Sequence, residues 1–230
     1  MFHEKSLPAG RQAVVLLSGG LDSAVALYFA KKSGFKCSCL IFDYGQRHKR
    51  EIESARYIAK KANCPAQVMK IDLPWKGSSL LDRKISVVGH KVTREIPSTY
   101  VPARNIIFLS FALSFAEAMG AEAIFIGAHS QDYSGYPDCR AEFFRAFSKV
   151  ILTGTKAGCQ RKGIRIKAPL INKNKAEIIK LGRRLKVPFA LTWSCYRGGK
   201  VPCGKCDSCF FRAKGFKEAR IKDPLYEFKR

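Results

Sequence analysis

Short, continuous apolar runs alternate along this chain with longer segments in which apolar residues recur every three or four positions. The short runs have the length and composition of buried strands, and they cover residues 13–17, 37–42, 67–71, 123–127 and 164–168. The longer segments have the periodicity of amphipathic helices, as at Leu109 and Leu113. They predict helices over about 22–32, 49–62, 104–119, 139–152 and 175–185.

A strand, a helix and a further strand in succession favour a parallel sheet, because right-handed crossovers place the helices on both faces. We therefore expect an α/β fold built on a doubly wound, Rossmann-like, mostly parallel five-stranded sheet. Its ligand crevice should lie at the carboxyl ends of the strands.

Two segments depart from this alternation. Residues 74–102 form a long stretch of mixed pattern, which predicts a loop excursion over the active site. Residues 191–230 carry clustered cysteines, glycines and basic residues. The predicted organisation is a main domain over 1–190 with a C-terminal segment over 191–230 packed on it.

Composition supports a folded enzyme-sized domain. The 230 residues are 47% hydrophobic, enough for a substantial core. The apolar runs are too short for a secretory signal or for the roughly 20 residues of a membrane span. We therefore expect a cytoplasmic protein without membrane contact, whose nine cysteines are thiols or metal ligands and not disulfides.

The net charge of +24 is large and uneven. Residues 1–150 hold 21 basic and 13 acidic side chains, whereas residues 151–230 hold 21 and 5. Such a field raises encounter rates with polyanions such as nucleotides or RNA. A solvated basic surface without a nucleic-acid partner explains the charge equally well.

The loop after the first predicted strand reads SGGLDS, from Ser18 to Ser23. Backbone N–H groups of such a loop, together with the start of the next helix, form a site for phosphate or pyrophosphate. Glycines let the backbone approach closely, and serine hydroxyls can donate to phosphate oxygens. Asp22 is placed either to cap the helix or to hold Mg²⁺, and a plain glycine turn with Asp22 as the N-cap is the simpler alternative.

Four cysteines in the C-terminal segment follow the pattern C-x7-C-x2-C-x2-C, and they are Cys195, Cys203, Cys206 and Cys209. Four thiolates at this spacing can close a tetrahedral, structural zinc site, with Gly204 allowing the tight turn. An iron–sulfur cluster is the alternative. Four other cysteines are expected to be ordinary small residues: Cys37, Cys39, Cys64 and Cys159.

The SGGLDS loop resembles the pyrophosphate loop (PP-loop) of the N-type ATP pyrophosphatase superfamily, whose members cleave ATP between the α and β phosphates. Further stretches read DYGQRHKRE, STYVPARN, GAHSQDYSGYPDCR, WSCY and CGKCDSC. Together they resemble the 7-cyano-7-deazaguanine (preQ0) synthase family of queuosine and archaeosine biosynthesis. The most specific element is DYSGYPDCR followed by WSCY and CGKCDSC, and the resemblance covers nearly the whole chain.

This resemblance implies an ATP-dependent carbon–nitrogen ligase. The expected reaction converts 7-carboxy-7-deazaguanine and ammonia to 7-cyano-7-deazaguanine through an adenylated carboxylate and an amide. It also implies a PP-loop domain over 1–190, one structural Zn²⁺ per chain, Mg²⁺, ATP as a substrate and a homodimer. Free ammonia is the expected nitrogen source.

The resemblance assigns roles by position. Catalytic candidates are Asp22, Arg104 and Asp132, and the metal ligands are the four cysteines above. The ATP-binding candidates are Leu17, Ser18, Gly19, Gly20, Leu21, Asp22, Ser23, Ala24, Val25, Ala26 and Leu27. The substrate-binding candidates are Arg104, Asn105, Asp132, Tyr133, Asp138 and Arg140. Arginine suits a carboxylate and aspartate suits the N–H edge of a guanine-like ring.

Each role has a structural alternative. Arg104 could pair with Asp43 or Glu51, and Asp132 could cap a turn. His48 and His129 are candidate proton shuttles or structural histidines. An RNA-directed thiolation enzyme would need a catalytic thiol outside the metal cluster, for which Cys139 is the placed candidate. A zinc-stabilised RNA-binding module would leave SGGLDS unexplained.

Overall fold

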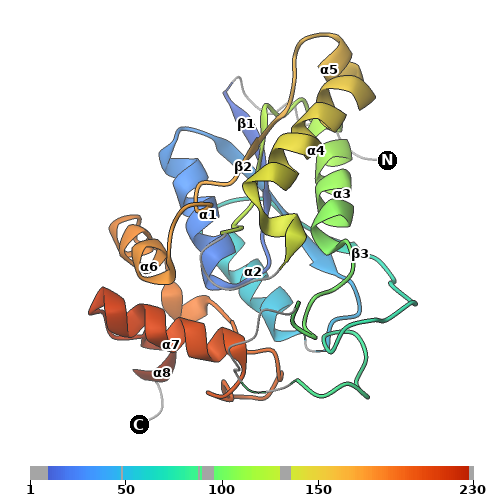
Figure 1. Cartoon of the computed structure of the whole chain (residues 1–230). Coiled ribbons are helices and arrows are strands. Elements are labelled where there is room, and N and C mark those ends of the chain that lie inside the picture. Colours follow the sequence, from blue (N-terminus) through green and yellow to red (C-terminus); the bar gives the residue numbers. More distant parts are fainter. Residues whose placement is uncertain (1–9, 48, 88, 90–95, 130–135, 228–230) are drawn as a thin grey trace.

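The computed structural model describes residues 10–47, 49–87, 89, 96–129 and 136–227. Within them the chain forms a five-stranded parallel sheet of order β3-β2-β1-β4-β5 (Figure 1). All five predicted strands and the predicted fold class are confirmed. The strands are β1 (Gln12–Leu16), β2 (Lys36–Asp43), β3 (Ala66–Lys70), β4 (Ala123–Phe125) and β5 (Arg165–Lys167).

The five predicted helices are also present, with ends shifted by a few residues. They are α1 (Leu21–Lys32), α2 (Arg50–Lys61), α3 (Arg104–Ala118), α4 (Ala141–Gly154) and α6 (Lys175–Arg184). The pattern did not predict three further helices, α5 (Lys156–Cys159), α7 (Asp207–Ala219) and α8 (Pro224–Glu227), or the 3₁₀ turns η1 (Pro137–Cys139) and η2 (Phe189–Leu191).

Alternation along the central strand divides the core into two layers. Ala13 and Val15 of β1 pack in one buried cluster with residues of α1, α2 and α6, while Val14 and Leu16 pack in a second with α3 and α4. Side chains alternate across a strand, so a strand that is apolar at every position is covered on both faces. This explains why β1 is a continuous apolar run (Figure 1).

The connections reverse direction between β1 and β4. From β1 the chain moves outward through β2 and β3, and it then returns to place β4 on the other side of β1. A crevice opens outside the carboxyl ends of the strands at such a switch point, where doubly wound folds bind their ligands. The loop from Ser18 to Ser23 begins there.

The C-terminal segment packs on the sheet domain through α7, which lies against α6 (Figure 1). Phe216 and Ala219 of α7 belong to the same buried cluster as β1 and α1. Arg212, 2% exposed, forms an ion pair with Asp223 at 2.6 Å and donates to the hydroxyl of Thr192 at 2.7 Å. The division at residue 190 stays a prediction.

The described helices include none with the length and apolar character that a membrane crossing requires.

Candidate active site and metal centre

A cavity of about 870 Å³ lies at the carboxyl ends of β1 and β4. Three parts of the chain close it: the loop after β1, the excursion predicted to cover the site, and the C-terminal segment. The excursion contributes Gly89 and residues 96–99, as predicted. The segment contributes Trp193, Ser194, Tyr196 and residues of α7.

The loop after β1 brings the start of α1 to this cavity. Helix α1 begins at Leu21 with Gly20 as its N-cap, and no side-chain hydrogen bond caps it among the described residues. Asp22 lies in the first turn of α1 and lines the cavity. The N-cap is Gly20, so the alternative that Asp22 caps the helix is wrong. A helix N-terminus without a side-chain cap keeps its N–H groups for an anion.

Two serines brace the loop from within. The Ser23 hydroxyl donates to the Gly20 carbonyl at 3.1 Å and accepts from the Ser18 backbone N–H at 3.2 Å. The hydroxyls of Ser18 and Ser23 lie 3.0 Å apart. Phosphate binding by Ser23 therefore stays a prediction that requires its hydroxyl to change acceptor.

Two glycines are required by close packing. A Cβ on Gly19 would lie 2.0 Å from the Glu51 carbonyl oxygen, and Gly19 has φ +84°. A Cβ on Gly127, just after β4, would lie 2.7 Å from the Ser23 nitrogen. The loop thus packs between the first turn of α2 and Gly127, which follows β4. Strand β4 ends at Phe125, before the predicted residue 127.

Asp22 forms a partly buried ion pair that the sequence did not predict. The Lys175 ammonium lies 3.0 and 3.1 Å from the two Asp22 carboxylate oxygens, and His129 Nε2 lies 3.7 Å from one of them. The Lys175 and His129 side chains are 13% and 11% exposed. Burial alone would raise the pKa of Asp22, but Lys175 and His129 hold it well below its usual range.

Lys175 is the first residue of α6, whose N-cap, Asn174, forms a capping box with Glu177. The capping pattern was visible in the sequence. It located the start of a helix, however, and gave no sign that the first residue reaches Asp22.

A second polar group lines the cavity around Arg104, the first residue of α3. The Arg104 guanidinium donates to the Tyr44 hydroxyl at 3.2 Å. Burial raises the pKa of Glu51 to about 7, an effect that Arg104 and a hydrogen bond with Gln46 only partly oppose. Burial also raises the pKa of Tyr44 to about 12. The alternative that Arg104 pairs with Glu51 is therefore partly right. Their charges interact, but the ion pairs found among the described residues do not include these two.

The other substrate-binding candidates divide into three groups. Asn105 lines the cavity. Asp138 is 5% exposed and lies behind Asn105, where its carboxylate accepts the Asn105 backbone N–H at 3.1 Å, and Arg140 is exposed outside the cavity lining. Asp132 and Tyr133, with His48, lie outside the described residues.

The ATP-binding candidates also separate by position. Those facing the cavity are Leu17, Ser18, Gly20, Leu21, Asp22 and Ser23. Residues 24–27 of α1 are completely buried in the two-layer core and position the loop from behind. Cys139 also lines the cavity, where its sulfur accepts a hydrogen bond from the Asn105 side chain at 3.2 Å.

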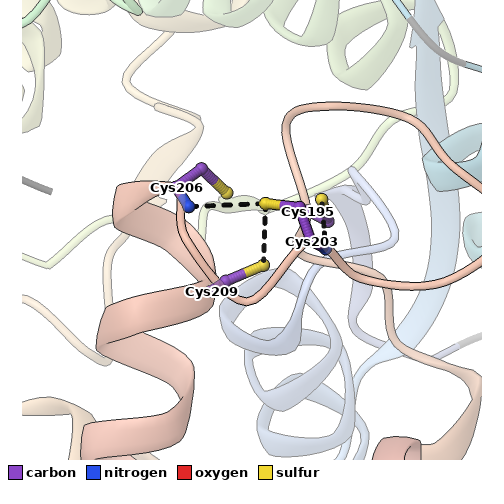
Figure 2. Close-up of side chains that lie close together, drawn as sticks. All are labelled: Cys195, Cys203, Cys206 and Cys209. Atoms are coloured by element: carbon purple, nitrogen blue, oxygen red, sulfur yellow. Dashed lines mark hydrogen bonds between the residues drawn. The ribbon is translucent and has the colours of Figure 1, made fainter. Parts of the chain in front are cut away.

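The four predicted metal ligands converge at the start of α7 (Figure 2). Their sulfur atoms all lie within 4.8 Å of one another, and those of Cys203 and Cys209 are 3.9 Å apart. A tetrahedral zinc site with Zn–S bonds of about 2.3 Å has sulfur–sulfur edges of roughly 3.8 Å. The donor set therefore fits a four-thiolate metal site.

Backbone geometry supports a thiolate cluster. The N–H groups of Lys205 and Cys206 both point at the Cys203 sulfur, each at 3.4 Å. Gly204, between Cys203 and Lys205, has φ +70°, as the predicted tight turn requires. N–H donors aimed at one sulfur stabilise its charged form.

The metal cluster is linked to the cavity by backbone contacts. The backbone N–H of Trp193 donates to the Gly19 carbonyl at 2.9 Å. Gly89 of the excursion forms a β-bridge with Cys206. Arg50 of α2 stacks on the Trp193 ring at 4.4 Å. A metal bound by the cysteines would therefore stabilise a wall of the cavity.

Comparisons with known proteins found relatives that match nearly the whole chain. The family model described as "Queuosine biosynthesis protein QueC" matches residues 12–220. The chain is 54% identical over 216 residues to 7-cyano-7-deazaguanine synthase 2 of Desulfitobacterium hafniense (strain Y51), covering 94% of this chain and 92% of that protein. It is 51% identical over 220 residues to 7-cyano-7-deazaguanine synthase of Nostoc punctiforme, covering 93% and 98%.

Among solved structures, the fold is similar to that of a 4-thiouridine synthetase in complex with RNA and bound ATP. The TM-score is 0.53 at 19% sequence identity, covering 91% of this chain and 50% of that one. At this identity the likeness concerns the fold alone.

Proposed function

This chain belongs to the QueC family of queuosine biosynthesis proteins, whose curated members are ATP-dependent 7-cyano-7-deazaguanine synthases, and we propose that the cavity at the ends of β1 and β4 is where it makes the nitrile. The observation that carries this proposal is the ion pair between Asp22 of the SGGLDS loop and Lys175. Both residues line a cavity that Arg104 also lines. It combines a phosphate site with a site for an anionic, flat substrate.

The proposed reaction activates the same carbon substituent twice. The carboxylate of 7-carboxy-7-deazaguanine attacks the α-phosphorus of ATP, which releases pyrophosphate and forms an acyl adenylate. Ammonia displaces AMP and leaves an amide and a proton. The amide oxygen then attacks a second ATP, pyrophosphate leaves again, and loss of AMP and a proton yields the nitrile.

We assign the phosphates to the loop from Ser18 to Ser23 and the N-terminus of α1. Lys175 neutralises charge that builds up on the leaving pyrophosphate, which lowers the barrier to both activations. The Asp22 carboxylate offers a hard oxygen ligand, and one such carboxylate with substrate phosphates is a usual Mg²⁺ site. Bound Mg²⁺ would supply further charge neutralisation at the phosphates.

We assign the substrate carboxylate to Arg104, because its planar fork can donate to both oxygens. Asn105 contributes a second polar contact, and Asp138 positions Asn105 from behind. Asp132, Tyr133 and Arg140 remain substrate-binding proposals on the resemblance alone.

We assign a structural Zn²⁺ to the four cysteines, since a closed four-thiolate shell leaves no open position for substrate. The cytoplasmic location, the homodimer and the use of free ammonia remain predictions.

The test is a product assay with metal-replete protein, 7-carboxy-7-deazaguanine, Mg²⁺, ATP and an ammonium salt. Mass spectrometry should detect the nitrile with about two AMP and two pyrophosphate per product. Asp22→Asn should lower the rate of nitrile formation at least a hundredfold. Glu53→Gln, at an exposed acid on α2 outside the cavity lining, should leave the rate unchanged. Unchanged acid with intact ATP would refute the assignment, and bulk tRNA would be tested next as the acceptor.

A further inference from the structure

The cavity holds three carboxylates among the described residues: Asp22, Glu51 and Asp207. Asp22 belongs to the loop after β1, and both of its carboxylate oxygens accept hydrogen bonds from Lys175. Asp207 is the first residue of α7, next to the metal ligand Cys206. Glu51 is left without a role in the reaction described above.

The surroundings of Glu51 keep its carboxyl group ready to accept hydrogen bonds. The neighbouring Gln46 is itself buried and is fixed by bonds with the Tyr44 N–H at 2.8 Å and the Phe42 carbonyl at 3.1 Å. Arg104 interacts with Glu51 electrostatically without a direct ion pair. Glu51 is partly buried, and a carboxylate with incomplete charge compensation gains from N–H donors supplied by a ligand.

Aromatic side chains line the same part of the cavity. They are Phe42, Tyr44, Phe108, Tyr136 and Tyr196. Phe42 stacks on Phe108 with ring centroids 4.0 Å apart, and Tyr44 meets the edge of Phe108 at 5.3 Å. A site with flat apolar walls and one carboxylate suits a planar heterocycle with adjacent N–H donors.

Glu51 also lies next to the phosphate loop, because its backbone carbonyl packs against Gly19. A ring held by Glu51 would therefore sit beside the bound phosphates. This arrangement brings a substituent on the ring toward the α-phosphate, as adenylation requires.

We propose that Glu51 is the specificity-determining residue for the ring, accepting the N1–H and 2-amino hydrogens of a 2-amino-6-oxo (guanine-like) edge while Arg104 takes the carboxylate side. This inference rests on the proposed function and names the group that selects the substrate class. Asp138, which the sequence suggested for that edge, lies behind Asn105 and outside the cavity lining.

The experiment measures binding of the product, 7-cyano-7-deazaguanine, by calorimetry on the full-length metal-replete protein without ATP. The comparison ligand is the same nitrile without the 2-amino group. The unmodified protein should bind the 2-amino ligand at least tenfold more tightly, because the analogue leaves a buried acceptor unpaired. Glu51→Gln should lose at least tenfold for the 2-amino ligand and most of the discrimination.

Two further variants make the result specific. Glu53→Gln carries the same chemical change on the exposed side of α2 and should bind like the unmodified protein. Glu51→Asp keeps the carboxylate and should keep a preference for the 2-amino ligand at reduced affinity. In turnover assays Glu51→Gln should raise the KM for the acid while the KM for ATP is unchanged.

The outcomes separate this inference from the proposed function. If the protein makes the nitrile but Glu51→Gln binds and discriminates as before, the role of Glu51 is refuted and the proposed function stands. If the unmodified protein neither binds nor makes the nitrile, both are refuted.

Discussion

At Asp22, two opposing effects act on one carboxyl group. Burial raises its pKa, and the nearby Lys175 and His129 side chains lower it by more. The net direction is downward, so the group stays ionised at neutral pH. The stabilisation that this pair provides is present above the unfolded pKa and is lost only as the pH falls toward the lowered folded value.

The Asp22–Lys175 pair gives a prediction about catalysis. Lys175→Met should lower kcat at least a hundredfold, because it removes a positive charge from the leaving pyrophosphate. Combined with Asp22→Asn, the loss should be much smaller than the product of the two single losses, since both residues act on the same phosphates. The measurement is steady-state release of pyrophosphate for the single and double variants. Fully multiplicative losses would show that the two residues act separately.

Glu51 gives a prediction about stability with the opposite sign. Its folded pKa of about 7 lies above the unfolded value, so the folded state loses stability as the pH rises from about 4.5 to 7. Glu51→Gln removes this penalty and should stabilise the protein by roughly 2 kcal/mol more at pH 8 than at pH 5. Denaturant unfolding at both pH values, with Glu53→Gln as the control, measures the difference. An equal effect at both values would contradict the raised pKa.

At the scale of elements, α2 joins three parts of the site. Its first turn packs against Gly19, directs Glu51 into the cavity and stacks Arg50 on Trp193. The C-terminal segment also meets the loop after β1, through the hydrogen bond from the Trp193 backbone N–H to the Gly19 carbonyl. We therefore expect a metal bound by the four cysteines to stabilise the proposed active site through these contacts.

Metal removal should consequently reduce both stability and activity. Cys203→Ser should lower the zinc content from one per chain to none and the Tm by roughly 10 °C, because metal binding contributes several kcal/mol to folding. Cys159→Ser, at an exposed thiol outside the cluster, should change neither. Elemental analysis and thermal unfolding on the purified variants give the two readouts. Iron in place of zinc would support the cluster alternative.

The elements that the sequence predicted correctly are those whose pattern is local. Strand β1 is apolar at consecutive positions, and the four cysteines lie close enough in the chain for their spacing to indicate a site. Helix α7 was not predicted because only one of its buried residues, Phe216, is large and apolar. The others are Cys209, Arg212, Gly215 and Ala219. The sequence did not predict Lys175 and Glu51 as site residues, because only the fold brings them to the loop after β1.

The charge of the whole molecule is concentrated toward its C-terminal part. Helices α6 and α7 pack together. The exposed basic residues on these helices and just after them are Lys180, Arg183, Arg184, Lys186, Lys214, Lys217 and Arg220. Two acidic residues, Glu177 and Glu218, are exposed on these helices. One of these residues, Lys214, also lines the cavity.

The protein should therefore bind nucleic acid weakly and in a salt-dependent manner. Affinity for bulk tRNA should fall steeply between about 50 and 200 mM salt. Replacing Lys180, Arg183 and Arg184 with Glu should reduce the salt dependence more than the same change at Arg56, Lys60 and Lys61 of α2. Filter binding measures both, and kcat for nitrile formation should be unchanged in either variant. Equal losses would indicate that the charge acts diffusely.

The hydrogen bond between Trp193 and Gly19 also has a consequence for protein synthesis. The phosphate loop is made early by the ribosome, but the residue that fixes its carbonyl is made near the end of the chain. At usual elongation rates this delay lasts on the order of ten to thirty seconds. We therefore expect a nascent chain to lack a finished wall of the proposed nucleotide site, and to hydrolyse no ATP, until the segment that carries Trp193 has left the ribosome.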